Sequence, residues 1–154
     1  MSDLIFSPVE LQGIKTINFM LRSSPNIDES KIGEVQRLEL SGEFSELELD
    51  NTRAICTGTL SVSLGIYERE DDELEPQVFT EMQVQGTIAV PYKEEEHDNI
   101  TRWARTNLIA ILYSHIRSTV DLISSTSNFG KIILPAIDPQ YAASICTRED
   151  YANV

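Results

Sequence analysis

The chain has 154 residues, of which 41% are hydrophobic and 24% are charged, a composition typical of one globular domain. Its 12 lysines and arginines stand against 25 aspartates and glutamates, so the formal net charge is −13. Binding to nucleic acid or to an anionic membrane surface needs clustered cations, and this balance argues against both kinds of partner. The charge favours solubility and basic protein partners.

The N-terminal residues, the apolar runs and the cysteines indicate the cellular compartment. The N-terminal residues lack the basic stretch and the long apolar segment of a secretory signal. No apolar run reaches the ~20 residues that a membrane-spanning helix needs. We therefore expect a cytoplasmic protein. Its two cysteines, Cys56 and Cys146, are expected to be free thiols, with a disulfide or a metal pair as the minority alternative.

Alternating apolar residues predict two extended strands in the first third of the chain. In residues 9–21 most apolar side chains share one phase, but Ile14 breaks it, which indicates a bulge or bend near Gly13. A loop rich in Ser, Pro and Asn follows. The second strand covers residues 35–49, and its phase slips near residues 45–46, again a bulge or a bend.

The clearest alternation lies in residues 54–66 and 78–90. One side of each segment carries aliphatic residues, and the other side carries Thr, Ser, Gln and, in the second segment, Glu81. This pattern is typical of an antiparallel sheet with one buried and one polar face. An acidic loop, residues 68–76, separates the two segments.

The period then changes from two to about 3.6, which predicts a long helix. Asp98 or Asn99 is the expected N-cap, and the helix should end within residues 124–127, giving a rod of roughly 40 Å. An apolar connector over residues 129–137 contains a proline, and a short helix should follow over residues 140–150. Four strands, a long helix, a connector and a short helix predict a single α+β domain.

Signatures of catalysis are weak throughout the sequence. His97 and His115 have no second His or Cys at ligand spacing, which argues against a metal site. The sequence contains no nucleophile elbow, no phosphate-binding loop and no dinucleotide-binding motif. We therefore expect a binding protein without enzymatic activity, cofactor or metal.

Several local segments, taken in order, carry a family likeness over about residues 9–141. The segments are Ser63-Leu64-Gly65, Gln85-Gly86-Thr87-Ile88, Ile111-Leu112-Tyr113 followed by Arg117, Phe129, residues 132–135 and residues 138–141. Together with the predicted order of elements, these segments resemble the SecB family of protein-export chaperones. The family's Cys-Pro-Asn stretch before the helix aromatic is missing, and the acidic loop is longer, so the chain resembles a diverged member.

The resemblance implies an ATP-independent holdase that binds unfolded preproteins in an apolar groove and passes them to an export motor. In SecB-like proteins the connector lies over the helix and helps to form this groove, so Phe129, Ile132 and Tyr141 are candidates for client binding. Trp103 and Tyr113 are further candidates, although aromatic residues on such a helix belong more often to the core.

The acidic loop has two interpretations. It is either a solvated hairpin tip or a docking patch for a basic partner. The resemblance favours docking, because the family recruits its SecA-like motor ATPase through exposed acidic residues of the sheet. The docking candidates are Glu68, Glu70, Asp71, Asp72, Glu73, Glu75 and Glu81.

The expected assembly is a homo-tetramer, a dimer of dimers, with a dimer as the alternative. The predicted helix has apolar residues on more than one stripe, including Ile109 and Ala110 beside Ile111 and Leu112, which is typical of a helix with two contacts. The subunits of SecB-like proteins are joined partly through such helices.

Two other functions remain open: a dedicated chaperone of a single client such as an antitoxin, and an acidic inhibitor or adaptor of a basic partner.

Overall fold

The fold places its strands first and its helices afterwards. The computed structural model describes residues 9–24, 33, 35–67, 75–127 and 130–152, with side chains as far as Cys146. The α+β class predicted from the sequence is confirmed. The elements are β1 (Glu10–Ser23), β2 (Val35–Phe44), β3 (Glu48–Asp50), β4 (Arg53–Tyr67), β5 (Val78–Pro91), the 3-10 turn η2 (Glu94–Glu96), α1 (His97–Ser124) and α2 (Pro139–Ala152).

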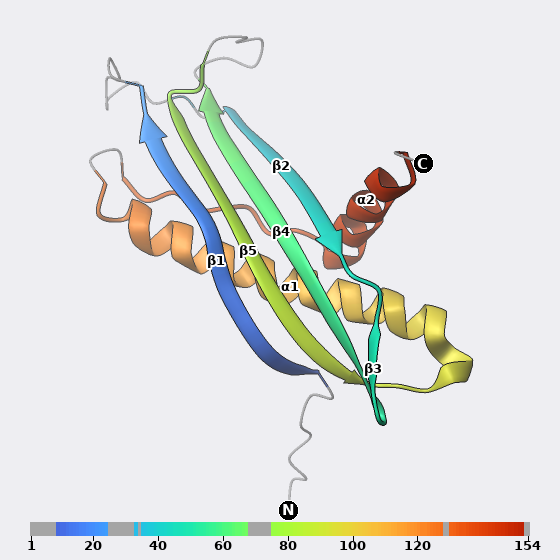
Figure 1. Ribbon diagram of the computed structural model, residues 1–154. Helices are drawn as coiled ribbons and strands as arrows, with labels where there is room; N and C mark the ends of the chain where they lie inside the picture. The colour runs from blue at the N-terminus through green and yellow to red at the C-terminus, as the bar shows by residue number, and fades with distance from the viewer. Residues whose placement is uncertain (1–8, 25–32, 34, 68–74, 128–129, 153–154) are drawn as a thin grey trace, which may run out of the picture.

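The strands form one antiparallel sheet in the order β1-β5-β4-β2, and the short β3 also pairs with β4 (Figure 1). The two strands with the clearest alternation, β4 and β5, are therefore the central pair. Among the described strands, β1 forms one edge of the sheet, and β2 with β3 forms the other.

The predicted irregularities of the two outer strands are confirmed. The register of β1 against β5 shifts between Leu11 and Gly13, and it shifts again between Thr16 and Asn18. The slip expected near residues 45–46 is a break between β2 and β3. At this break Ser45 Oγ accepts a hydrogen bond from the Thr57 N–H (3.2 Å), so a side chain replaces a ladder partner.

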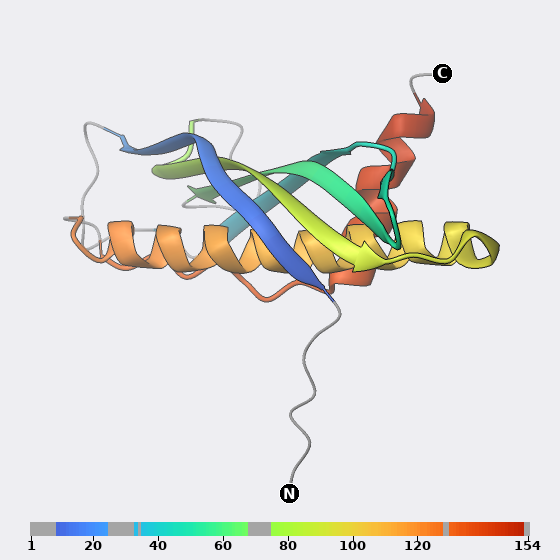
Figure 2. The same ribbon diagram turned by 60° about the horizontal axis from the view of Figure 1, so that its bottom comes forward.

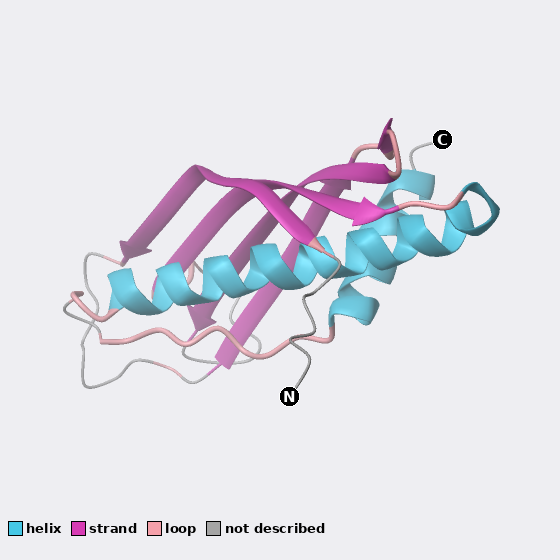
Figure 3. Ribbon diagram, turned by 90° about the horizontal axis from the view of Figure 1, so that it is seen from below, coloured by secondary structure: helices cyan, strands magenta, loops and turns pink. Residues whose placement is uncertain are grey.

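α1 lies along one face of the sheet, and α2 lies at the β2 side of the molecule (Figures 2 and 3). α1 packs against β4 and β5, whereas α2 packs against α1 and β2. The even-numbered residues of β4 and β5 face α1 and are buried. The odd-numbered ones are half-buried on the outer face as far as Thr87, except Gly65, which is buried. No described helix covers that outer face, which agrees with the polar face predicted from its Thr, Ser and Gln side chains.

The N-terminus of α1 differs from the prediction. The helix begins at His97, and neither Asp98 nor Asn99 is its N-cap; Glu96 takes this position without a side-chain cap. The three glutamates of η2 form a separate turn in which the Glu96 N–H donates to the Lys93 carbonyl (3.0 Å). Asp98 therefore lies in the first turn of the helix, where its charge is favourable near the positive end of the helix dipole.

Two glycines let α1 approach the centre of the sheet. Gly58 of β4 and Gly86 of β5 lie opposite each other and are buried. A Cβ atom on Gly58 would lie 2.4 Å from the Phe44 ring and 3.0 Å from Leu108 Cδ2. A Cβ atom on Gly86 would lie 2.6 Å from Leu112 Cδ2. Leu108 and Leu112 thus occupy the space that the two missing side chains leave.

We expect Gly58→Ala to lower the free energy of unfolding by ~1–3 kcal/mol, because the added methyl group must displace Phe44 or Leu108 in a packed core. Gly13→Ala is the matched control, since nothing lies within 4 Å of a Cβ atom there, and it should change stability by less than ~0.5 kcal/mol. Urea denaturation followed by circular dichroism measures both. Equal losses would contradict the close-approach explanation.

Candidate functional site

The connector between the helices, residues 130–138, runs back along α1 (Figure 2). Hydrogen bonds fix it to α1 at two separate places. The Tyr113 hydroxyl donates to the Pro135 carbonyl. Ser124 Oγ, which is buried, accepts from the Ile132 N–H at 2.7 Å. The backbone of the connector is therefore held in position by two side chains of the helix.

Connector side chains alternate between core and surface. Ile132 and Leu134 are buried in the core cluster, whereas Ile133 is 55% exposed between them. Lys131 Nζ, at the start of the segment, pairs with Asp121 at 3.1 Å. The connector thus behaves as an additional extended layer that contributes apolar contacts to the core on one side and exposes an apolar residue on the other.

The structure divides the five predicted client-binding residues into separate groups. Tyr113 and Ile132 are each 5% exposed and belong to the same core cluster. Trp103 is 40% exposed on α1, and Tyr141 is 66% exposed in the first turn of α2. Phe129 lies outside the described residues. Tyr113 follows the core alternative for helix aromatics, and only Trp103 and Tyr141 present a large surface in this structure.

The electrostatics of the core agree with this division. Burial raises the pKa of the Tyr113 hydroxyl, and the nearby Arg117 guanidinium opposes the shift. Burial likewise raises the pKa of the Cys56 thiol, against the opposing effect of Arg105. Cys56 and Cys146 are both free and buried. A raised pKa keeps the thiol protonated and unreactive, so Cys56 is a structural cysteine.

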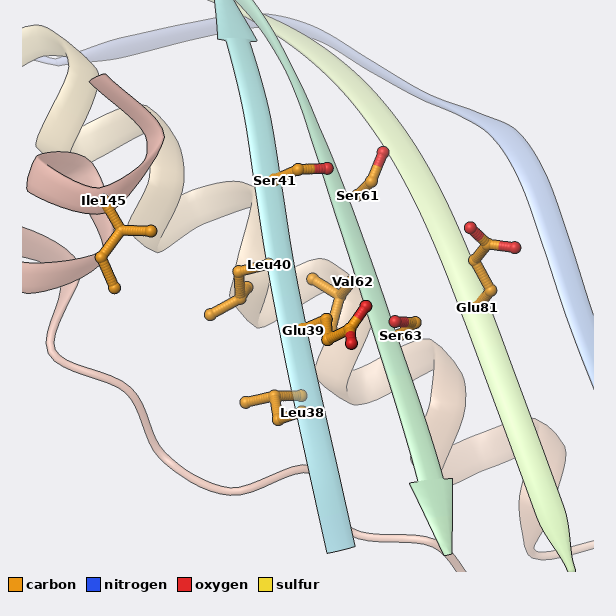
Figure 4. Close-up of a pocket in the computed structure, with 9 residues that line it drawn as sticks. All are labelled: Leu38, Glu39, Leu40, Ser41, Ser61, Val62, Ser63, Glu81 and Ile145. Atoms are coloured by element: carbon orange, nitrogen blue, oxygen red, sulfur yellow. The ribbon is translucent and has the colours of Figure 1, made fainter. Parts of the chain in front are cut away.

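A pocket of about 440 Å³ lies at the β2 edge of the sheet, beside α2 (Figure 4). Its apolar part comes from alternate residues of β2 and from α2, and its polar part comes from the outer face of the sheet. The lining residues are Leu38, Glu39, Leu40, Ser41, Ser61, Val62, Ser63, Glu81 and Ile145.

The polar side of this pocket brings two carboxylates into one row. Glu39 of β2 lies opposite Ser63 of β4, and Ser63 lies opposite Glu81 of β5. Opposed residues of antiparallel strands project to the same face, so both carboxylates lie on the outer face with a small Ser between them. Negative charge therefore lies directly beside the apolar pocket.

Of the predicted docking residues, Glu81 lies in this pocket and Glu75 is exposed just before β5. The other five candidates, Glu68, Glu70, Asp71, Asp72 and Glu73, lie outside the described residues. Sequence reasoning found the alternation of Leu38 and Leu40 but did not assign them to a site. That assignment needs the strand order, because only an edge strand has a free side.

The described residues contain no cluster of three or more His, Cys, Asp or Glu side chains suited to a metal ion. No helix in the described part of the chain has both the length and the hydropathy to span a bilayer.

The chain has a SecB-like fold, as the resemblance in its sequence indicated. Among solved structures it is similar to Rv1957, a SecB-like chaperone of Mycobacterium tuberculosis in complex with a ChAD peptide from the Rv1956 HigA1 antitoxin. The TM-score is 0.53 at 15% sequence identity, over 84% of this chain and 90% of that chain. At this low identity, the similarity shows that the two chains share a fold.

Among curated proteins, the chain is similar to the uncharacterized protein MJ0357 of Methanocaldococcus jannaschii. The two are 27% identical over 125 residues, which are 81% of this chain and 74% of that protein. No family model matches the chain.

We expect Tyr113→Phe to lower the free energy of unfolding by ~1 kcal/mol near pH 7, because the variant loses the hydrogen bond to the Pro135 carbonyl. The raised pKa of Tyr113 adds a pH dependence. Its contribution is fully present below the unfolded-state pKa of about 10 and is lost as pH rises through the higher folded-state pKa.

The stability difference between wild type and Tyr113→Phe should therefore shrink above about pH 10. Urea denaturation at neutral and alkaline pH measures it. Ser124→Ala, which removes the other anchor of the connector, is the control, because it should lose stability without this alkaline dependence. A constant difference for Tyr113→Phe across the range would show that the hydroxyl is not held in a buried site.

Proposed function

We propose that the chain is an ATP-independent chaperone that binds extended segments of unfolded polypeptides at the β2 edge of its sheet. The observation that carries the proposal is the open pocket at that edge, where Leu38, Leu40 and Ile145 form an apolar wall next to an edge strand (Figure 4). The similarity to a SecB-like chaperone in complex with a peptide supports the same role.

An edge strand beside an apolar wall suits clients of many sequences. A client in extended conformation can pair its backbone with the free side of β2, and such pairing does not depend on its side chains. Each apolar client side chain buried against the wall contributes ~1.5–3 kcal/mol. Neither contribution requires nucleotide hydrolysis, as expected of a holdase. Trp103 and Tyr141 offer further exposed aromatic surface for longer clients.

The fate of the client is part of the proposal. In the first form, the chaperone works in the cytoplasm and delivers preproteins to a basic, SecA-like export motor that docks on its acidic surface. Glu81 on the outer face and the exposed Glu75 belong to that surface. In the second form, the chain serves a single client such as an antitoxin, which the antitoxin peptide in complex with Rv1957 favours.

We further propose that the chain assembles as a homo-tetramer, a dimer of dimers. Two of the exposed apolar residues that lie away from the β2 pocket are candidates for contacts between copies. Ile17, 50% exposed, lies on the other edge strand, β1, and Leu122, 71% exposed, lies in the last turns of α1. Burial of these residues against a second copy would remove apolar surface from water.

The wild-type protein should suppress aggregation of an unrelated denatured protein, followed by light scattering without ATP. Ile145→Ser and Leu40→Ser should weaken binding of an unfolded client about tenfold, because each removes part of the apolar wall. Leu49→Ser is the matched control, since Leu49 is exposed on β3 outside the pocket. Melting temperatures identify any variant whose loss reflects unfolding.

The range of clients separates the forms of the function. Suppression of many unrelated proteins supports a general holdase, and suppression of one protein supports a dedicated chaperone. No suppression of any client, with full binding to a basic partner, would overturn the chaperone proposal in favour of an acidic adaptor or inhibitor.

Multi-angle light scattering at micromolar concentration should give a mass of about four chains, with two as the alternative. Leu122→Asp should reduce the mass, because it places a charge in an apolar contact between copies. A monomer at that concentration would count against the assembly.

A further inference from the structure

The free side of β2 carries two different chemistries on its two faces. Successive side chains of a strand point to opposite faces. Leu38 and Leu40 face the helices and line the pocket with Ile145, whereas Glu39 and Ser41 project to the outer face (Figure 4). A client strand paired with β2 would therefore place alternate residues against an apolar wall and against a carboxylate.

From this arrangement, and resting on the proposed function, we propose that the β2 edge selects client segments in which a basic residue lies between two apolar residues. Glu39 is the specificity-determining residue. It lies opposite the middle position of such a segment, and Leu38 and Leu40 lie on either side of it.

The electrostatic surroundings support this role for Glu39. Ion pairs among the described residues join Arg53 to Glu10 and Asp50, and Lys131 to Asp121, and Glu39 belongs to none of these pairs. Arg37, on the same face of β2, lies over the Tyr67 ring, with its guanidinium carbon 4.2 Å from the ring centroid.

The second carboxylate of the row strengthens the negative potential at this edge. Glu81 lies two strands away from Glu39, across Ser63. The formal net charge of −13 has the same sign. A basic side chain entering beside Glu39 is therefore attracted, and an acidic one is repelled.

The position of α2 limits the length of the selected segment. A Cβ atom on Gly42 would lie 3.2 Å from Cys146 Sγ, so α2 closes the inner side of β2 from that residue onward. The pocket accordingly uses β2 residues from Leu38 to Ser41 and none beyond them. The site therefore fits a short pattern of three alternating residues.

Three fluorescent peptides test the proposal by anisotropy on the full chain. They are ten residues long and polar at the ends, with the cores Val-Lys-Val, Val-Glu-Val and Val-Val-Lys. Wild type should bind Val-Lys-Val about threefold to tenfold more tightly than Val-Glu-Val, because opposite charges across a strand pair attract and like charges repel. Val-Val-Lys, which has the same composition but a broken alternation, should bind less tightly than Val-Lys-Val.

Glu39→Lys should reverse the order of the Val-Lys-Val and Val-Glu-Val peptides. Glu43→Lys is the matched control, because Glu43 lies on the same strand and face but outside the pocket, and it should keep the wild-type order. Hydrogen exchange with bound Val-Lys-Val should show added protection of backbone amides in residues 37–41.

Two results would overturn the inference while leaving the chaperone proposal intact. One is equal affinity for all three peptides in a protein that still suppresses aggregation. The other is an unchanged preference in Glu39→Lys. Protection of β1 amides in place of β2 amides would contradict both the inference and the β2 edge as the proposed binding site. Failure to bind any peptide, together with failure to suppress aggregation, would instead remove the proposed function itself.

Discussion

The packing of α1 onto the centre of the sheet depends on the absence of two side chains. Gly58 and Gly86 form a bare pair across β4 and β5, and Leu108 and Leu112 fill the space above it. Because the helix is close to the sheet there, the buried residues of both central strands and of the helix share one core cluster. The connector then completes this core through Ile132 and Leu134.

This central packing determines where the molecule stays open. α1 covers the middle strands, and α2 covers only part of the β2 side, so apolar residues remain accessible near the edge. The core holds the scaffold rigid, while the edge offers backbone groups, an apolar wall and a row of carboxylates within one pocket. These are the groups that the proposed binding of an extended chain would use.

Local signals in the sequence were sufficient for most of the fold. The alternation of β4 and β5 predicted both strands to within a residue or two, since a half-buried strand repeats every second residue. The phase breaks near Gly13 and residues 45–46 predicted real irregularities. The expected N-cap of α1 was wrong by two or three residues, because a 3-10 turn formed by the glutamates precedes the helix.

The candidate site was less accessible to sequence reasoning. Its residues are local only within β2, and the rest come from β4, β5 and α2, which the sheet order and the path of the connector bring together. Tyr113 and Ile132 show a second difficulty, which is to distinguish core residues from groove residues by sequence. An apolar residue on a helix or a connector has the same pattern whether it faces the core or a groove, and only the packing distinguishes the two.

The break after β2 affects whether copies of the chain can aggregate through their sheet edges. An open strand edge is a template for sheet growth between copies, which ends in aggregation. β2 ends at Phe44, where the Ser45 hydroxyl accepts a hydrogen bond from the Thr57 N–H, so the regular edge stops at that residue. Antiparallel pairing of two β2 edges centred on Glu39 or on Ser41 would place Glu39 against itself or against Glu43. The carboxylates that would attract a basic client segment in the proposed site therefore also disfavour pairing of β2 with the β2 strand of another copy.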